Sequence, residues 1–276
     1  MIENQKKLNF KGGVVPALGF GTYDIRGKEC TEAVRHAIEV GYRHIDTARF
    51  YDNEHEVGQG LKQSQADRDE IFLTTKIWNT ELAPHKFIKS TEESLRTLKV
   101  DHVDLLLVHW PTKDEKETLL AVETLNDCLQ KGYAKYVGVS NFNVTLMEKS
   151  VSLAPIVCNQ TEYHPYLHID RFIDFVRNHD MFLTAYCPLA QGAVFKDEVL
   201  KSIAAKHGKS IGQIVLKWFL QQDQIAMIPK ASKPEHRISN YAVWDFELTT
   251  EEYVAIQKLD RQYRIINPGW SCDWSK

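Results

Sequence analysis

Residues 70–109 read EIFLTTKIWNTELAPHKFIKSTEESLRTLKVDHVDLLLVH. The two ends, 70–78 and 103–109, are nearly continuous apolar runs, which is typical of strands buried on both faces of a parallel sheet. Between them, residues 83–100 are predicted to form a helix with Pro84 in its first turn, where proline is well tolerated. A helix that links two such strands predicts a unit of an α/β fold.

The same alternation extends along most of the chain. Strands are predicted at 17–22, 42–48, 70–78, 103–109, 134–141, 156–164, 182–190 and 225–231. Helices are predicted at 28–41, 54–64, 83–100, 118–132, 144–153, 170–180, 197–208, 211–222, 233–240 and 249–260. Eight strand–helix units with right-handed crossovers predict a (β/α)8 TIM barrel. Two helices exceed this repeat, one after the seventh strand and one at the end, and we expect them to pack outside the barrel.

The N-terminal part adds a further element. LNFKGGVVPAL (8–18) predicts a β-hairpin that turns at Gly12 and Gly13. The length of 276 residues is ordinary for one barrel, and no linker or low-complexity segment interrupts the sequence. We therefore expect one domain over residues 1–276.

Composition excludes several classes of protein. The net charge is -3, and basic residues alternate with acidic ones, so we expect no nucleic-acid partner. No apolar run approaches the length of a membrane span, and the N-terminus lacks a signal-peptide core. The 5 cysteines are far apart and show no CxxC spacing, so we expect neither disulfides nor a metal site. A cytoplasmic protein with reduced thiols is the simplest interpretation.

Four titratable residues follow strand-like runs: Asp46, Tyr51, Lys76 and His109. Asp46, Lys76 and His109 stand about thirty residues apart, one strand-plus-helix unit each, so a barrel would gather them at its C-terminal face. An ammonium beside a phenol favours the phenolate, so we expect Lys76 to lower the pKa of Tyr51 while Asp46 keeps the lysine charged. An imidazole can orient a carbonyl. Each residue alone would be ordinary, but together they predict an active site that protonates an oxyanion.

Ordered motifs over nearly the whole chain resemble the aldo-keto reductase family. They are GFGTY (19–23), GYRHIDTARFYDNEHEVG (41–58), TTKIW (74–78), LVHWP (107–111), GVSNF (138–142), NQTEYHP (159–165), AYCPL (185–189) and PKASKPEH (229–236). The resemblance implies that NADPH delivers hydride to a carbonyl carbon while Tyr51 protonates the oxygen. FKDEVLKSIAAKHG (195–208) is similar to bacterial members that reduce 2,5-diketo-D-gluconate, methylglyoxal and β-keto esters.

The cofactor would not bind as in a Rossmann fold, because no GxGxxG motif is present. The resemblance implies instead that the dinucleotide lies across the barrel mouth. It implies cofactor contacts from Gly21, Thr22, Asp46, Ser140, Asn141, Gln160, Tyr186, Leu189, Gln191, Gly192, Lys230, Ser232, His236, Arg237 and Asn240. Ser140, Asn141 and Gln160 would hold the nicotinamide carboxamide, and Tyr186 would stack on the ring.

The segment for the adenosine 2′-phosphate departs from the family pattern. Lys230 matches the lysine that pairs with the phosphate, but His236 stands where arginine is usual, and Arg237 follows one position later. Arginine binds phosphate more strongly than histidine does. We therefore expect a preference for NADPH and leave use of NADH open.

The substrate would meet an aromatic pocket of Tyr23, Phe50, Trp78, His109 and Trp110. The C-terminal tail, 262–276, is short, which indicates an open site for small polar carbonyls, although Trp270 and Trp274 could fold over it. A carboxylate on the substrate would require a cation, for which Arg49 and His55 are nearby candidates.

Two other functions stay open. Lys76 could form a Schiff base in a barrel lyase, although Asp46 would hold it charged and poorly nucleophilic. The chain could also be a non-catalytic NADP redox sensor that regulates a partner, but the complete set of four residues favours catalysis. We expect a monomer whose partner is a small carbonyl molecule.

Overall fold

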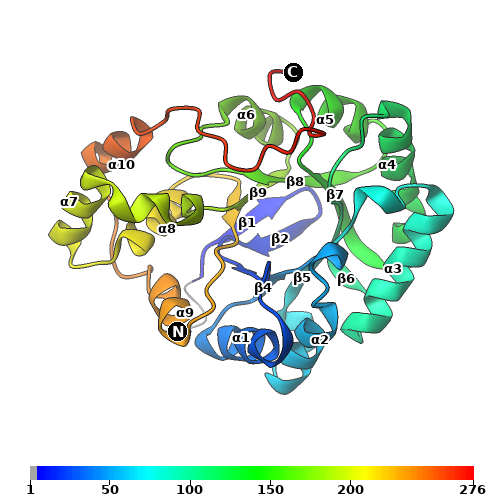
Figure 1. Cartoon of the computed structure of the whole chain (residues 1–276), viewed down its shortest axis with the longest axis horizontal. Helices are drawn as coiled ribbons and strands as arrows, with labels where there is room; N and C mark the ends of the chain where they lie inside the picture. The colour runs from blue at the N-terminus through cyan, green and yellow to red at the C-terminus, as the bar shows by residue number, and fades with distance from the viewer. Residues whose placement is uncertain (1–4) are drawn as a thin grey trace.

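A closed parallel sheet forms the centre of the protein, whose computed structural model describes residues 5–276 (Figure 1). Its eight strands are hydrogen-bonded in chain order: β3 (Phe20–Gly21), β4 (His44–Asp46), β5 (Phe72–Ile77), β6 (Val103–Val108), β7 (Ala134–Ser140), β8 (Ile156–Glu162), β9 (Phe182–Tyr186) and β10 (Ile225–Met227). Leu18 and Met227 form a parallel bridge, and the amide of Gly19 donates to the carbonyl of Met227 at 2.8 Å. The first and last strands are thereby joined, and the sheet closes into a barrel.

Helices surround this sheet. The barrel helices are α1 (Gly27–Val40), α2 (Glu54–Gln63), α3 (Pro84–Leu98), α4 (Glu115–Gln130), α5 (Val144–Val151), α6 (Asp170–Asn178), α8 (Ile211–Leu220) and α9 (Pro234–Tyr241). Two more, α7 (Glu198–His207) and α10 (Thr250–Gln257), contact each other at the periphery. The predicted (β/α)8 barrel with an N-terminal hairpin and two extra helices is confirmed.

Local sequence explains the ends of several elements. Every residue of β5, β6 and β8 is buried, as expected for strands covered by helices. Helix α3 begins at Pro84. Helix α1 ends at Gly41, whose φ of 128° suits glycine and where a Cβ would lie 2.5 Å from the Tyr241 ring. The eighth strand is shorter than predicted because residues 228–230 leave the sheet and line a cavity.

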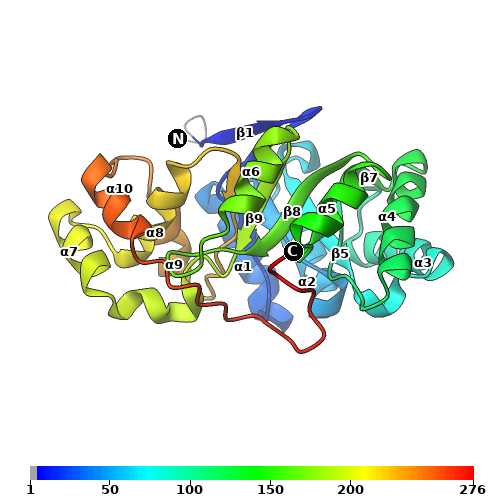
Figure 2. The same cartoon turned by 90° about the horizontal axis from the view of Figure 1, so that it is seen from above.

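The hairpin of β1 (Lys7–Phe10) and β2 (Gly13–Pro16) lies at the end of the barrel opposite the C-terminal tail (Figure 2). The prediction that it turns at Gly12 and Gly13 is wrong, because Phe10 pairs with Gly13 and the turn consists of Lys11 and Gly12. Gly13 is needed for a different reason: a Cβ there would lie 2.4 Å from the hydroxyl oxygen of Tyr136. The hairpin therefore closes the N-terminal end of the barrel and leaves the other end for chemistry.

Candidate active site

The four predicted catalytic residues come together at the C-terminal end of the barrel. Asp46 ends β4, Tyr51 ends the 3-10 helix η2 (Arg49–Tyr51), Lys76 lies in β5, and His109 directly follows β6. The ammonium of Lys76 donates to Oδ1 of Asp46 at 2.6 Å and to the hydroxyl oxygen of Tyr51 at 3.3 Å. The rings of Tyr51 and His109 are 5.7 Å apart between centroids.

Tyr51 is a neutral phenol in this site. Burial raises its pKa well above the usual value, and the negative charge of Asp46 acts in the same direction. The expectation of a net lowering of the Tyr51 pKa is therefore wrong, because burial is the largest influence on it. Because the hydroxyl accepts its hydrogen bond from Lys76, its own proton is free to be donated into the cavity.

His109 is a neutral imidazole. Burial lowers its pKa well below the usual value, and the charge of Lys76 adds to the effect. Its Nδ1 is buried without a hydrogen-bond partner among the described residues. An uncharged ring cannot act as a strong acid near neutral pH, but one N–H can orient a carbonyl oxygen.

Lys76 lies behind the phenol and is fully buried. Burial lowers the pKa of its ammonium, and the adjacent Asp46 carboxylate opposes that shift. A third hydrogen bond joins the ammonium to the carbonyl of Thr47 at 2.8 Å. Lys76 is not among the residues that line the cavity, so this position suits tuning of Tyr51 rather than attack on a substrate.

A hydrogen-bonded chain links the Asp46 carboxylate to the residues predicted for the nicotinamide. Gln160 Nε2 donates to Oδ2 of Asp46 at 2.7 Å, and Ser140 Oγ donates to the carbonyl of Gln160 at 2.9 Å. Asn141 Nδ2 donates to Ser140 Oγ at 3.0 Å, and the Tyr186 hydroxyl donates to Asn141 Oδ1 at 2.7 Å. These side chains are therefore held in fixed orientations.

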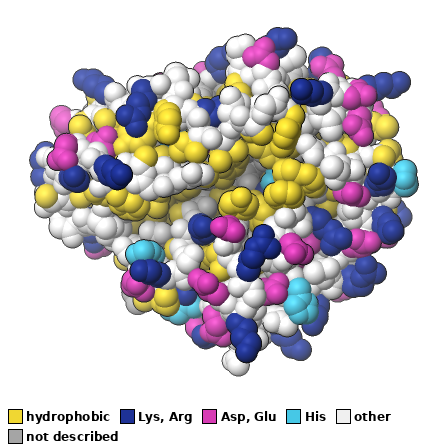
Figure 3. Space-filling model, in the orientation of Figure 1, with side chains coloured by type: hydrophobic (Ala, Val, Ile, Leu, Met, Phe, Trp, Pro, Cys, Tyr) yellow, Lys and Arg dark blue, Asp and Glu magenta, His cyan; other side chains and the backbone are white. Residues whose placement is uncertain are grey.

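A cavity of about 1070 Å³ opens beside these residues. Figure 3 shows a hollow on this face with hydrophobic side chains at its edge. The predicted cofactor residues that line the cavity are Gly21, Asp46, Ser140, Asn141, Gln160, Tyr186, Leu189, Gln191, Gly192, Lys230, His236 and Asn240. Sequence reasoning missed Asp24, Ser210, Gly212, Ser239 and residues 265–268, because no local pattern marks a loop that reaches a distant cavity.

These residues fit a nicotinamide dinucleotide. The cavity slightly exceeds the volumes usual for ligand pockets, about 300–1,000 Å³, so it has room for a dinucleotide and a small carbonyl. One part carries the polar amides of Asn141 and Gln160, and another carries the cation of Lys230. Gly21 also lines the cavity, and its lack of a Cβ lets the Ile228 backbone lie close beside it, since a Cβ there would be 2.7 Å from the Ile228 carbonyl oxygen.

Three predicted cofactor residues do not line the cavity: Thr22, Ser232 and Arg237. Thr22 Oγ1 donates to the carbonyl of Asp46 at 3.0 Å. Arg237 is buried and donates to the carbonyl of Ser232 at 2.6 Å and to Nδ1 of His36 at 3.1 Å. Arg237 therefore braces the segment that carries Lys230, and its guanidinium is already engaged.

The predicted substrate residues form an aromatic wall. Phe50 stacks on Trp78 at 3.8 Å between ring centroids, and His109 packs edge-on against Trp78 at 4.9 Å. Trp270, from the C-terminal tail, packs edge-on against Trp78 at 5.9 Å and against Trp110 at 5.1 Å. The tail thus extends the wall over the cavity.

Neither candidate for binding a substrate carboxylate lies in this wall. Arg49 forms an ion pair with Glu93, and His55 is hydrogen-bonded to Gln59 at 2.9 Å. Neither is among the residues that line the cavity, whose basic members are Lys230 and the two histidines, His109 and His236. The aromatic part of the cavity therefore favours uncharged carbonyl compounds.

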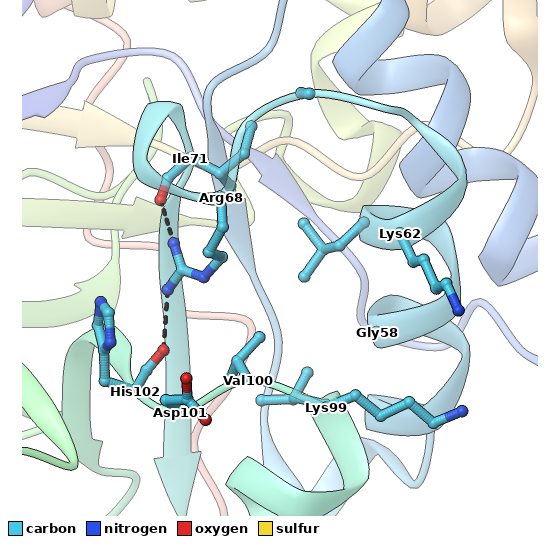
Figure 4. A pocket seen from close by; sticks show the side chains of 11 residues that line it. Gly58, Lys62, Arg68, Ile71, Lys99, Val100, Asp101 and His102 are labelled. Carbon is cyan, nitrogen blue, oxygen red and sulfur yellow. Dashed lines mark hydrogen bonds between the residues drawn. The ribbon is translucent and has the colours of Figure 1, made fainter.

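A second hollow of about 380 Å³ lies between α2, the end of α3 and the segment that precedes β5 (Figure 4). Arg68 crosses it and donates to the carbonyls of Ile71 at 2.6 Å and His102 at 3.0 Å. Ile71 and His102 precede β5 and β6, so this hollow lies at the N-terminal end of the barrel. Arg68 therefore has a structural role there, and catalysis belongs to the opposite end.

The described residues show no metal centre, membrane-spanning helix or disulfide. Across residues 5–276, no group of three or more His, Cys, Asp or Glu side chains is placed to hold a metal ion. No helix in this range combines the length and apolar character needed to cross a membrane. All 5 cysteines carry free thiols.

Known proteins resemble the chain over most of its length. A model of the aldo/keto reductase family matches residues 17–261. The chain is 37% identical over 265 residues to methylglyoxal reductase DkgB of Escherichia coli O157:H7, with 94% of this chain and 99% of that protein covered. It is 40% identical over 259 residues to glyoxal reductase of Bacillus subtilis, with 92% of each chain covered.

Solved structures show the same likeness. One that is provisionally described as 2,5-diketo-D-gluconic acid reductase B superposes with a TM-score of 0.94 at 39% identity, over 99% of this chain and 98% of that chain. A variant of Gox0644 in complex with NADPH superposes with a TM-score of 0.88 at 34% identity, over 93% of this chain and 94% of that chain.

Proposed function

Because the chain belongs to the aldo-keto reductase family, we propose that it reduces small aldehydes and ketones to alcohols with NADPH. The substrates are proposed to be 2-oxoaldehydes such as methylglyoxal, with β-keto esters and 2,5-diketo-D-gluconate as further candidates. The relatives named for methylglyoxal and glyoxal support the first class. The wall of uncharged aromatic side chains favours neutral carbonyls over the sugar acid.

The observation that carries the proposal is the hydrogen bond from Lys76 to the Tyr51 hydroxyl at 3.3 Å. It leaves the phenolic proton free to be donated to a carbonyl oxygen, and the ammonium stabilises the phenolate that remains. Asp46 keeps the ammonium charged and in place. His109 orients the carbonyl oxygen through a single N–H.

The cofactor, when bound, supplies the hydride that the carbonyl carbon receives. Gln160, Ser140 and Asn141 are proposed to hold its amide, and Tyr186 to lie against its ring. Lys230 and His236 are the residues proposed to contact the 2′-phosphate, with NADH as a weaker alternative. The protein is further proposed to act as a cytoplasmic monomer of one domain, which sedimentation and cell fractionation would test.

The test follows NADPH absorbance with methylglyoxal and phenylglyoxal for the wild type and for Tyr51→Phe. Removing the phenolic acid should lower kcat on the order of a hundredfold or more while NADPH still binds. Tyr133→Phe is the matched control, because its hydroxyl contacts only the exposed Glu92 at the surface. A wild type that binds NADPH and reduces neither compound would support the sensing role instead, and a borohydride-trapped adduct on Lys76 would support the lyase.

A further inference from the structure

Glu162 belongs to the NQTEYHP motif, but neither the catalytic nor the cofactor contacts use it. It ends β8, and its side chain is fully buried. Its carboxylate accepts hydrogen bonds from the backbone amides of Ile265 at 2.6 Å and Ile266 at 2.7 Å. His164 Nε2 lies 3.0 Å from Oε1 of the same carboxylate. A buried barrel carboxylate thus holds two successive amides of the C-terminal tail.

The proton between His164 and Glu162 can be assigned from the neighbouring bond. Nδ1 of His164 accepts from the amide of Tyr166 at 3.3 Å, so Nε2 must carry a proton and donates it to Glu162. All contacts to the carboxylate therefore come from donors, as an ionised acceptor requires. Burial raises the pKa of Glu162, but these hydrogen bonds outweigh it and hold the pKa below its usual value.

Residues 264–276, here called the strap, cross the C-terminal end of the barrel (Figure 2). Glu162 holds the strap at its start. At its far end, Asn143 Nδ2 donates to the carbonyl of Asp273 at 2.9 Å. Between these two anchors, Trp270 lines the cavity and packs on the aromatic wall. The position of Trp270 therefore depends on both anchors, of which only Glu162 is a buried charge.

Three further groups face this carboxylate, one of which is the Cys187 thiol. Arg264, on the strap, stacks on the Trp274 ring at 3.8 Å, and its charge attracts that of Glu162. Tyr186, on β9, also lies near enough to interact electrostatically. The strap is thus held to the barrel by hydrogen bonds to Glu162 and Asn143, and the Arg264 cation stacks within the strap itself.

We propose that Glu162 is the positioning residue of the strap: it holds Ile265 and Ile266 so that Trp270 closes the substrate end of the cavity. Glu162 thereby sets the affinity for the carbonyl substrate and leaves the chemical step to the four catalytic residues. The kinetic part of this inference rests on the proposed reductase function. The position of Trp270 does not depend on that function.

The test compares Glu162→Gln with Glu252→Gln. Glu252 is a matched control because it is also buried, accepts from His207 Nε2 at 2.8 Å and from the amide of Thr249 at 3.1 Å, and lies in α10. Glu162→Gln should raise KM for methylglyoxal and phenylglyoxal roughly tenfold, since a charge-assisted hydrogen bond is lost, and change kcat less than about twofold. Acrylamide quenching of tryptophan fluorescence should increase, and Glu252→Gln should match the wild type in every measurement.

Two results overturn the proposal. Quenching of Glu162→Gln equal to that of the wild type shows that the strap has not moved. A fall in kcat with unchanged KM shows that Glu162 acts on the chemical step instead. A wild type that reduces no carbonyl refutes the reductase function. Acrylamide quenching needs no turnover, so it still tests whether Glu162 holds the strap in that case.

A second variant covers the case in which Glu162→Gln fails to fold. Ile266→Pro removes one donor from the strap and leaves the barrel carboxylate unchanged. It should show the same increase in KM and in quenching. If KM and quenching of Ile266→Pro both equal those of the wild type, the proposal is contradicted.

Discussion

The ammonium of Lys76 lies 2.6 Å from Oδ1 of Asp46, and both side chains are withdrawn from solvent. Gln160 donates to the other oxygen of the same carboxylate. Asp46 therefore connects the group that stabilises the Tyr51 phenolate to the residues proposed for the nicotinamide. One buried carboxylate thus contacts both the Lys76 ammonium, beside the proposed proton donor, and Gln160, which is proposed to contact the nicotinamide.

Asp46→Asn should destabilise the protein because it leaves the Lys76 ammonium buried without its counter-charge. The expected loss in the free energy of unfolding is about 3–5 kcal/mol. Urea denaturation of the variant and the wild type measures it. Adding Lys76→Met to Asp46→Asn removes both charges and should recover part of the loss. A single variant as stable as the wild type would contradict the pairing.

Stability should fall as the pH decreases below about 6.5, in part because of His109. The unfolded imidazole gains a proton near pH 6.5, whereas the folded one, with its lowered pKa, does not. Below that pH the unfolded state binds more protons and is favoured. His44, whose pKa is also lowered by burial, adds to the effect. The urea midpoint should decrease between about pH 7 and pH 5, and less steeply in His109→Gln.

Gly13→Ala should destabilise the fold by about 1–3 kcal/mol, since the new Cβ would lie 2.4 Å from the Tyr136 hydroxyl oxygen and force it to move. Gly269→Ala is the control, because a Cβ there meets nothing within 4 Å. Thermal unfolding of both variants checks this. If Gly13→Ala were as stable as Gly269→Ala, the Tyr136 side chain would be shown to move aside at little energetic cost.

Lys230→Ala should raise KM for NADPH roughly tenfold and change KM for NADH little, because only the phosphorylated cofactor offers the dianion. Lys233→Ala is the matched control: it is an exposed lysine on the same segment that does not line the cavity. Initial rates with both cofactors measure the effect. Parallel increases for NADPH and NADH would exclude Lys230 as the phosphate contact.

Sequence and structure contribute differently to the cofactor segment. The resemblance placed Lys230 and Arg237 in the same group of contacts, and the structure separates them. The Arg237 guanidinium donates hydrogen bonds to the Ser232 carbonyl and to His36, which lies on α1. That partner is distant in the chain, so no local pattern could show that the guanidinium is already engaged.

The sequence by itself predicted the barrel and the gathering of Asp46, Tyr51, Lys76 and His109 at one of its ends. Alternating strand and helix patterns leave few ways to bury both faces of a sheet, and parallel strands bring their C-terminal ends to one face. The tertiary structure alone decided that burial raises the pKa of Tyr51, that Gly13 packs against Tyr136, and that Glu162 holds the strap. Each of these depends on burial or on contact between segments far apart in the chain. Solvent exclusion and long-range packing are properties of the folded molecule, which local sequence patterns do not contain.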